Sequence, residues 1–436
     1  MDTFFKLKEN GTTVNREIVG GITTFLAMAY ILAVNPNILA AEGTGLAWNS
    51  VFTATAVSAA AATLVMAFLA NLPVALAPGL GLNAFFTYTV VFGMGCSAAF
   101  ALTAVLIEGI IFIALSLFGI REKIIRSIPE GIKKAVAVGI GLFITIIGLV
   151  NAGIVSTHTG TAIGFVNFTM ENRTAIVAVI GLIITVVLYV MKVPGAILIA
   201  VIATTVIGIP FSVTAVPENW KPFSMPAAPH LFHFEWANVL SVKFFIVLFT
   251  FLFTDMFDTI GTLMGVAEQG NLKNPDGTIR NAKGALLADA IGTVAGACLG
   301  TSTVTSFVES TSGVAAGTRT GLASAVTGIL FLLSLFLTPL FSLVPAAATA
   351  PALIFVGYLM MQSASAIRFD DPTEGIPAFI TIMTMPFSYS ISKGIAWGMI
   401  SYVIAKCAAR RAKEIPVFTW ILAAVFVADI IFEACK

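Results

Sequence analysis

The chain has 436 residues, of which 58% are hydrophobic and 10% are charged, and its mean hydropathy is +0.99. Soluble domains carry about 25% charged residues, so this composition excludes a soluble protein and indicates one embedded in the lipid bilayer. The formal net charge of +1 excludes the basic surface that nucleic-acid binding needs, and we expect no nucleic acid among the partners.

Apolar runs recur from one end of the chain to the other, separated by short polar intervals. They are continuous stretches rather than the alternating strands of about 10 residues that build a membrane barrel, so we expect an all-α polytopic protein. A last apolar stretch, 417–434, is either an interfacial helix or a further span. Fourteen other runs are candidates for crossing the bilayer: residues 20–41, 51–70, 72–92, 99–119, 131–150, 174–191, 194–210, 243–268, 284–299, 300–318, 320–338, 346–363, 375–389 and 391–407.

The N-terminal segment is polar and the first apolar run is followed by many more, so we expect no cleaved signal peptide.

The basic residues predict an orientation. Basic residues are enriched on the cytoplasmic side of membrane proteins. If Lys6, Lys8 and Arg16 lie inside, alternation along fourteen spans places Lys133 and Arg411 inside as well. This pattern predicts a cytoplasmic N-terminus.

The third apolar segment, 72–91, carries signals that break a helix. Pro78 and the glycines that follow it prevent a regular helix, and we expect Asn83 to open a new one. Half-helix N-termini offer unpaired N–H groups at membrane depth, so such breaks often mark the binding site of a transporter.

A second broken segment, 299–321, occupies the corresponding place in the other half of the chain. It begins as an extended, β-rich run, and we expect it to turn helical near Ser306. The spacing of Ser306 and Glu309 matches a capping box, so Glu309 is either a helix cap, a ligand-binding acid or both.

The segment 244–268 is apolar but carries two acids in its middle, Asp255 and Asp258. A carboxylate at the bilayer centre costs at least ~2.5 kcal/mol, so intramembrane acids usually face a protein cavity. Their spacing of three residues puts both on one helical face, and we expect Thr262 close by and Gly261 to permit close approach of a neighbouring backbone. A charge-paired structural role is the alternative.

An internal repeat is visible at about half the chain length. PEGIKKAVAVGIGLFI resembles PAAATAPALIFVGYLM, with Pro129 matching Pro345. Seven spans in each half is an odd number, so the second copy must be inverted relative to the first. Inverted repeats are typical of secondary transporters.

Other embedded polar residues allow weaker interpretations. Glu108 either stabilises a helix contact or acts in transport, and Asp289 is interpreted mainly as an acid at a helix end. The cysteines lack metal-binding spacing, so we expect no metal and no cofactor. The sequence contains no nucleotide-binding loop, so a gradient of protons or sodium ions must supply the energy.

Four motifs extend across essentially the whole chain: GGITTFLAMAYILAVNP, APGLGLNAFF, FTDMFDTIGTLMGVA and LGTSTVTSFVESTSGVAAGTRTGL. They resemble the purine permeases of the nucleobase-cation symporter group, in the azaguanine-permease-like branch that moves adenine, guanine and hypoxanthine. The resemblance implies a fold of seven plus seven spans with an inverted repeat, in a bacterial cell (inner) membrane, and a homodimer. It also implies a core domain at 20–119 and 243–338 and a gate domain at 131–210 and 346–407.

The resemblance implies roles for residues of the broken segments. Glu309 matches the family's tenth-span acid that hydrogen-bonds the base, and Asn83 matches the polar residue of the third-span break. Phe307 falls where uracil permease has an aromatic residue next to the ligand, and Val308 lies between Phe307 and Glu309. All four are therefore expected to bind substrate.

The resemblance implies roles for the eighth span too. Aligned on uracil permease, Asp258 falls on the substrate acid and Thr262 on a proton-linked His. The resemblance therefore implies that Thr262 lies in the substrate site. Because this branch carries both acids, Asp255 is interpreted as the ligand and Asp258 as the coupling group, with Asp255 also a candidate for proton coupling.

The leading hypothesis is secondary active import of a purine base with a proton. A planar base needs donors and acceptors at its edge and an apolar wall, which Asp255, Glu309, Asn83 and Phe307 supply. The alternative is a transporter or channel for another small solute or anion, such as uracil, xanthine or a sulfate-like anion. Three acids at the same site, Asp255, Asp258 and Glu309, disfavour an anion. A hydrolase is disfavoured because H-E-x-x-H and G-x-S-x-G are absent, so we expect no enzyme.

Overall fold

The computed structural model describes residues 2–118, 129–158, 161–274 and 278–434. Helices dominate both halves of the chain. The first half contains α1 (Asp2–Phe5), α2 (Val14–Met28), α3 (Ile31–Leu39), α4 (Trp48–Val65), η1 (Met66–Ala70), α5 (Leu80–Ala84), η2 (Phe85–Gly93), α6 (Ala98–Leu117), α8 (Glu130–Asn151), α9 (Arg173–Val190) and α10 (Ala196–Gly208).

The second half has the corresponding series. It contains α11 (Val242–Gln269), α12 (Ala282–Leu299), α13 (Ser310–Ala315), α14 (Gly321–Ser334), α15 (Thr338–Ser342), α16 (Ala346–Met361), α17 (Pro372–Ser388), α18 (Ile391–Ala408) and α19 (Val417–Ala434). Every predicted span contains a helix, and within the described ranges nine helices are long and apolar enough to cross a membrane. The prediction of an all-α polytopic protein is confirmed. Residues 417–434 form a helix that packs against α18.

Two compact units make up the chain, and the larger contains Met1–Leu117 and Ile147–Phe355. Its helices pack through small residues, which let backbones approach closely. A side chain at Gly321, where α14 begins, would collide with the backbone of Ala67, and one at Gly313 would collide with Thr24 of α2. The expected close approach at Gly261 is wrong, because an added side chain there would meet no atom of the described residues within 4 Å.

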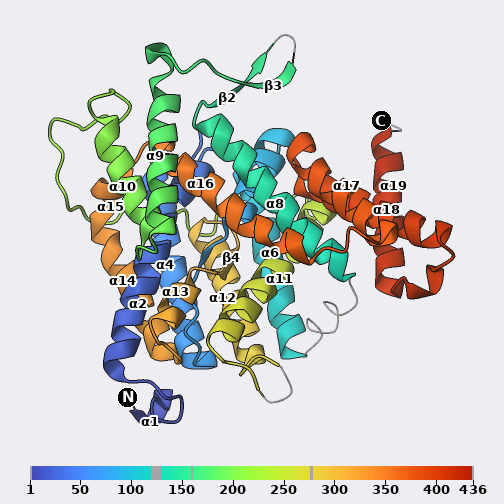
Figure 1. The fold of residues 1–436 in the computed structure, drawn as a ribbon, viewed down its shortest axis with the longest axis horizontal. Coiled ribbons are helices and arrows are strands. Elements are labelled where there is room, and N and C mark those ends of the chain that lie inside the picture. Colours follow the sequence, from blue (N-terminus) through green and yellow to red (C-terminus); the bar gives the residue numbers. More distant parts are fainter. Residues whose placement is uncertain (1, 119–128, 159–160, 275–277, 435–436) are drawn as a thin grey trace. The chain divides into compact units, whose positions relative to one another are not determined.

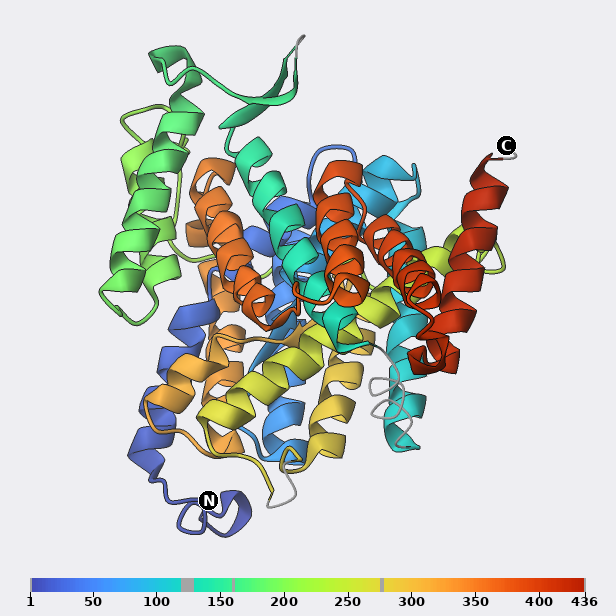
Figure 2. The same ribbon diagram turned by 45° about the vertical axis from the view of Figure 1, so that its right-hand side comes forward.

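The smaller unit contains Phe118–Ile146 and Val356–Lys436, and its helices α17, α18 and α19 are the red ribbons of Figures 1 and 2. Polar residues at the ends of these helices form ion pairs. Arg411 lies 2.8 Å from Asp371 and 2.7 Å from Glu414. Hydrogen bonds from Arg411 hold the pKa of Asp371 well below its usual range and, with Lys406, lower that of Glu414 to about 2.

Four short strands interrupt the helical pattern. The strands β2 (Val155–His158) and β3 (Thr161–Phe165) form an antiparallel hairpin between α8 and α9 that the sequence did not predict. This hairpin projects away from the neighbouring helices (Figures 1 and 2). The other two strands, β1 (Leu76–Pro78) and β4 (Val304–Ser306), come from the two broken segments and pair with each other.

The β1–β4 pair brings the two broken segments together inside the larger unit. The strands are antiparallel, with Ala77 opposite Thr305. Extended backbone at membrane depth is tolerated only where its polar groups are satisfied. The hydroxyl of Thr63 bonds both the N–H and the carbonyl of Leu76, and the Thr293 hydroxyl donates to the carbonyl of Val304 at 3.0 Å. Neighbouring helices therefore supply the hydrogen bonds that the short strands lack.

The expected starts of the two half-helices are wrong. α5 begins at Leu80 rather than at Asn83, and α13 begins at Ser310 with Glu309 as the residue before it. Ser306 is the last residue of β4, so Ser306 and Glu309 do not form a capping box. In the second segment the strand pairing reaches Ser306 and delays the helix, whereas in the first segment β1 ends at Pro78 and α5 begins before Asn83.

The internal repeat corresponds to two matching helix starts. Pro129 directly precedes α8, and Pro345 directly precedes α16. Each proline carbonyl accepts a hydrogen bond from the first turn, from Lys133 N–H at 3.1 Å and from Ala348 N–H at 2.9 Å. Proline is suited to a helix start because its missing N–H is not needed there. The matched sequences thus fold into the same local structure.

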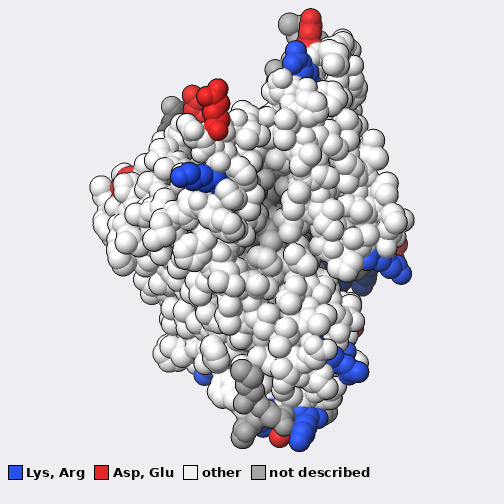
Figure 3. All heavy atoms as spheres, turned by 90° about the vertical axis from the view of Figure 1, so that its left-hand side faces the viewer, with Lys and Arg blue, Asp and Glu red and all other residues white. Residues whose placement is uncertain are grey.

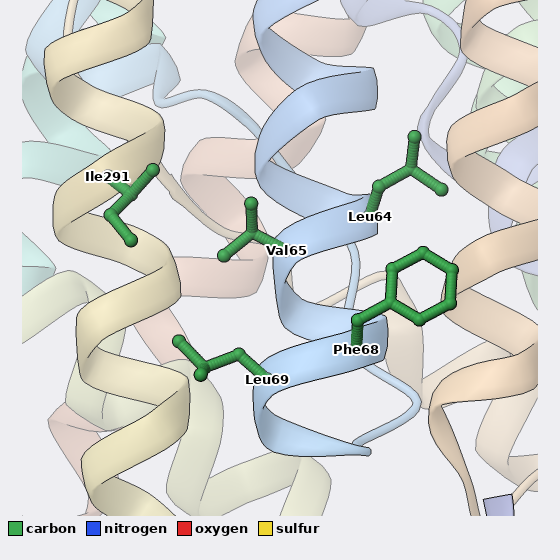
Figure 4. A pocket seen from close by; sticks show the side chains of 5 residues that line it. All are labelled: Leu64, Val65, Phe68, Leu69 and Ile291. Atoms are coloured by element: carbon green, nitrogen blue, oxygen red, sulfur yellow. The ribbon is translucent and has the colours of Figure 1, made fainter. Parts of the chain in front are cut away.

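The surface is suited to lipid. Figure 3 shows one face on which Lys, Arg, Asp and Glu gather in small groups, separated by a broad uncharged area. Figure 4 shows an apolar groove where α4 and η1 lie beside α12. Its lining contains aliphatic and aromatic side chains: Leu64, Val65, Phe68, Leu69 and Ile291. This groove offers nothing to bind the polar edge of a solute.

Candidate functional site

The acid of the second broken segment, Glu309, is held by a tyrosine. Its Oε1 accepts a hydrogen bond from the Tyr30 hydroxyl at 2.5 Å. Tyr30 lies between α2 and α3 and is fully buried, whereas Glu309 is only half-buried. Hydrogen bonds to a charged acceptor are about twice as strong as neutral ones, so Tyr30 fixes the orientation of this carboxylate.

Asn83 of the first broken segment lies in α5 and is fully buried. Its amide nitrogen donates to the carbonyl of Pro78 at 3.3 Å. Its Oδ1 is buried without a hydrogen-bond partner among the described residues, and so is the hydroxyl of Ser306 at the end of β4. A buried polar atom left unbonded costs about 1–3 kcal/mol, so a bound solute or water molecule would stabilise this region.

Asp255 of α11 is fully buried. The hydroxyl of Thr259 lies 3.2 Å from Oδ1 of Asp255 and 2.6 Å from Oδ1 of Asp289 on α12. Asp289 is also fully buried. The interpretation of Asp289 as mainly a helix-end acid does not describe this contact, because its carboxylate belongs to a buried chain of three oxygens.

Asp258, one turn along α11, contacts the broken segments instead. Its Oδ2 accepts a hydrogen bond from Thr305 of β4 at 3.2 Å. It lies close to Gly79, where an added side chain would come within 3.7 Å of the same oxygen, and it interacts electrostatically with Asp289 and, less strongly, with Glu309. Asp258 is half-buried, and of the two acids it is the one that contacts the β1–β4 pair.

Glu108 of α6 is a further embedded carboxylate near β4. It is fully buried, and its Oε2 accepts a hydrogen bond from the Thr303 hydroxyl at 2.7 Å. The carbonyl of Thr303 in turn accepts from the N–H of Gly79 at 3.0 Å. Glu108 thereby anchors the start of the second broken segment, which favours the structural interpretation of this residue.

The remaining residues implied by the resemblance lie around these groups. Phe307 follows β4, is 6% exposed and donates its N–H to the carbonyl of Ala75 at 3.0 Å. Val308 is 43% exposed. Thr262 is buried on α11, one turn beyond Asp258. Two apolar side chains, one buried and one exposed, thus directly precede Glu309 along the chain.

Two contributors to the site were missed by reasoning from the sequence. Tyr30 lies in an apolar segment more than two hundred residues from its partner, and only the motif around it, AMAYILAVNP, could have drawn attention to it. Thr305 was seen only as part of a β-rich run, although alternate residues of a strand share one face. Thr303 and Thr305 accordingly each donate to an embedded acid, Glu108 and Asp258 respectively.

The arrangement is suited to binding rather than to bond cleavage. It combines carboxylates, threonine hydroxyls and buried amide groups with apolar walls, which is the composition of a selective small-molecule site. Within the described ranges, no group of three His, Cys, Asp or Glu side chains is arranged to hold a metal ion. Paired broken segments beside embedded acids, in a chain with many membrane-length helices, define a secondary membrane transporter.

Comparisons with known proteins agree with this class. A family model described as "Permease family" matches residues 15–397. The guanine/hypoxanthine permease PbuG of Bacillus subtilis is 46% identical, covering 99% of this chain and 100% of its own. The adenine permease AdeP of Escherichia coli is 38% identical, covering 99% and 96%. The chain belongs to this permease family; it is a multi-pass membrane transporter and not an enzyme.

Solved structures show the fold. The transmembrane domain of the cyanobacterial bicarbonate transporter BicA superimposes with a TM-score of 0.61 at 15% identity, covering 91% of this chain and 97% of that domain. The anion transporter Slc26a9 in an inward-facing state gives 0.63 at 12% identity, covering 90% and 68%. The fold is therefore the inverted repeat of seven plus seven spans.

Proposed function

We propose that this protein imports purine nucleobases, namely guanine, hypoxanthine or adenine, together with a proton. The names of relatives that match over nearly their full length support the substrate class. One observation carries the proposal: two half-buried carboxylates, Glu309 and Asp258, lie beside the pairing of the two broken segments. Such a site can accept hydrogen bonds from the N–H groups at the edge of a neutral base.

In this proposal the base lies against the second broken segment. Glu309 accepts from its N–H groups, Asn83 supplies a buried amide, and Phe307 and Val308 form an apolar wall. The buried, unbonded Oδ1 of Asn83 supports this placement, because a ligand donor would satisfy it. Thr262 contributes a hydroxyl from α11.

The contacts of the two aspartates favour a division of roles opposite to the one expected from the sequence. Asp258 contacts Thr305 of the β1–β4 pair, so we assign it to the base. The hydroxyl of Thr259 has one hydrogen but lies within hydrogen-bond distance of both Asp255 and Asp289. A proton on one of these two carboxyl groups would supply the second hydrogen. We therefore assign proton coupling to Asp255.

The test of the function is uptake of radiolabelled bases by cells that lack their own permeases, with and without a protonophore. We expect uptake of guanine, hypoxanthine or adenine that the protonophore abolishes. Uracil, xanthine and sulfate serve as competitors. Uptake of uracil in preference to every purine would refute the substrate class, and protonophore-insensitive accumulation would refute proton coupling.

We further propose an alternating-access movement of the core (20–119 and 243–338) against the gate (131–210 and 346–407), with a cytoplasmic N-terminus in a bacterial inner membrane and a homodimeric assembly. Basic residues near the N-terminus support the orientation. Cysteine crosslinks between core and gate should stop transport, whereas crosslinks within the core should not. Equal inhibition by both kinds of crosslink would contradict this movement.

A further inference from the structure

The contact between Tyr30 and Glu309 bears on which purine the site prefers. The phenol of Tyr30 lies 2.5 Å from Oε1 of Glu309. Its position is fixed, because it stands between α2 and α3 with its side chain fully buried. A carboxylate accepts through two oxygens, and here one of them is already hydrogen-bonded within the protein.

This contact leaves Oε2 of Glu309 as the carboxylate oxygen to which no other side chain of the described residues donates a hydrogen bond. A ligand that needs only one acceptor loses no hydrogen bond because of the Tyr30 contact. A ligand that presents two neighbouring donors would use both oxygens, as in the two parallel hydrogen bonds of a bidentate carboxylate pair. Such a ligand must share Oε1 with the Tyr30 hydroxyl or displace it, so its second hydrogen bond is weakened.

Guanine and hypoxanthine differ in this respect. Guanine carries an N–H at position 1 and an amino group at the adjacent position 2, so it presents two neighbouring donors. Hypoxanthine has the same N–H at position 1 but no amino group. A Glu309 carboxylate without the Tyr30 hydrogen bond would bind guanine more tightly than hypoxanthine. With the hydrogen bond in place, its affinities for the two bases are more similar.

We propose that Tyr30 is a specificity-determining residue, which lets hypoxanthine compete with guanine by occupying Oε1 of Glu309. The proposal rests on the proposed function, because it takes the substrate to be a purine bound at Glu309. It adds that a side chain outside the broken segments sets the ratio of affinities for the two bases.

The test is Tyr30→Phe, which removes the hydroxyl and keeps the buried ring. Affinities of the purified protein for guanine and hypoxanthine are measured side by side. We expect the preference for guanine over hypoxanthine to rise about tenfold, the change expected for one additional hydrogen bond to a charged group. The matched control is Tyr88→Phe, because the Tyr88 hydroxyl bonds Asn151 at 2.8 Å and contacts none of the acids described above; there the ratio should stay unchanged.

An unchanged ratio in Tyr30→Phe, or an equal loss of affinity for both bases, would overturn the proposal, because a purely structural tyrosine affects both ligands alike. If Tyr30→Phe is recovered in poor yield, Tyr30→Met provides the same comparison with a flexible side chain. If the wild-type protein binds neither base, the proposed function itself fails. A failure of the tyrosine proposal is thus distinguishable from a failure of the substrate class.

Discussion

Replacing Glu309 by glutamine is expected to lower the affinity for purine bases by about one to two orders of magnitude, because hydrogen bonds to a charged group contribute about 1.5–3 kcal/mol. The structure adds a reason. The Tyr30 hydroxyl, which donates to Oε1 of Glu309, would select the amide oxygen of the glutamine and turn its NH₂ toward the ligand. Two donors would then face each other. Equilibrium binding of labelled guanine to the purified variant measures the loss.

The control for this experiment is Glu171→Gln, which removes an exposed acid outside the site and should leave the affinity unchanged. Thermal unfolding of both variants separates a binding defect from a folding defect. Wild-type affinity in a folded Glu309→Gln protein would show that Glu309 does not bind the base. The base would then have to bind elsewhere.

Asp255→Asn should separate binding of the base from its accumulation. The asparagine amide can donate to Thr259 as a protonated carboxyl would, so the variant mimics the protonated state permanently. We expect it to exchange internal for external base but not to concentrate it. One proton carried with a neutral base moves one charge, worth ~2.3 kcal/mol per 100 mV, which corresponds to roughly 40-fold accumulation in the wild type.

The matching variants decide between the two aspartates. Asp258→Asn should bind the base weakly, since Asp258 contacts the β1–β4 pair, and Asp370→Asn, at an exposed position, should behave as the wild type. If Asp258→Asn exchanges without accumulating while Asp255→Asn transports normally, the roles expected from the sequence hold, with Asp255 as the ligand and Asp258 as the coupling group. If both variants still concentrate purine in a protonophore-sensitive way, neither acid is the coupling site.

Much of the site could be predicted because its signals are local. An acid in an apolar run such as Asp258 is costly and therefore conspicuous, and Pro78 interrupts a helix whatever surrounds it. The match of Pro129 to Pro345 required only a comparison of the chain with itself, and both prolines do precede helices. These features depend on a few neighbouring residues, so they can be inferred without knowing the fold.

The contacts that define roles could not be predicted, because they join distant parts of the chain. Tyr30 reaches Glu309, and Thr259 reaches Asp289, only after the helices pack. The same is true of the pairing between β1 and β4, which moved the start of α13 beyond Ser306. Helix capping rules assume an isolated helix end, whereas here a strand from the other half of the chain takes precedence.

The most direct test of the central claim is an experimental structure of the protein with guanine bound. We expect the base between the two broken segments, with an N–H group within hydrogen-bond distance of Oε2 of Glu309 and with Asp258 on the same side. A base seated elsewhere, for example in the apolar groove lined by Leu64 and Ile291, or one that makes no contact with Glu309, would contradict the account.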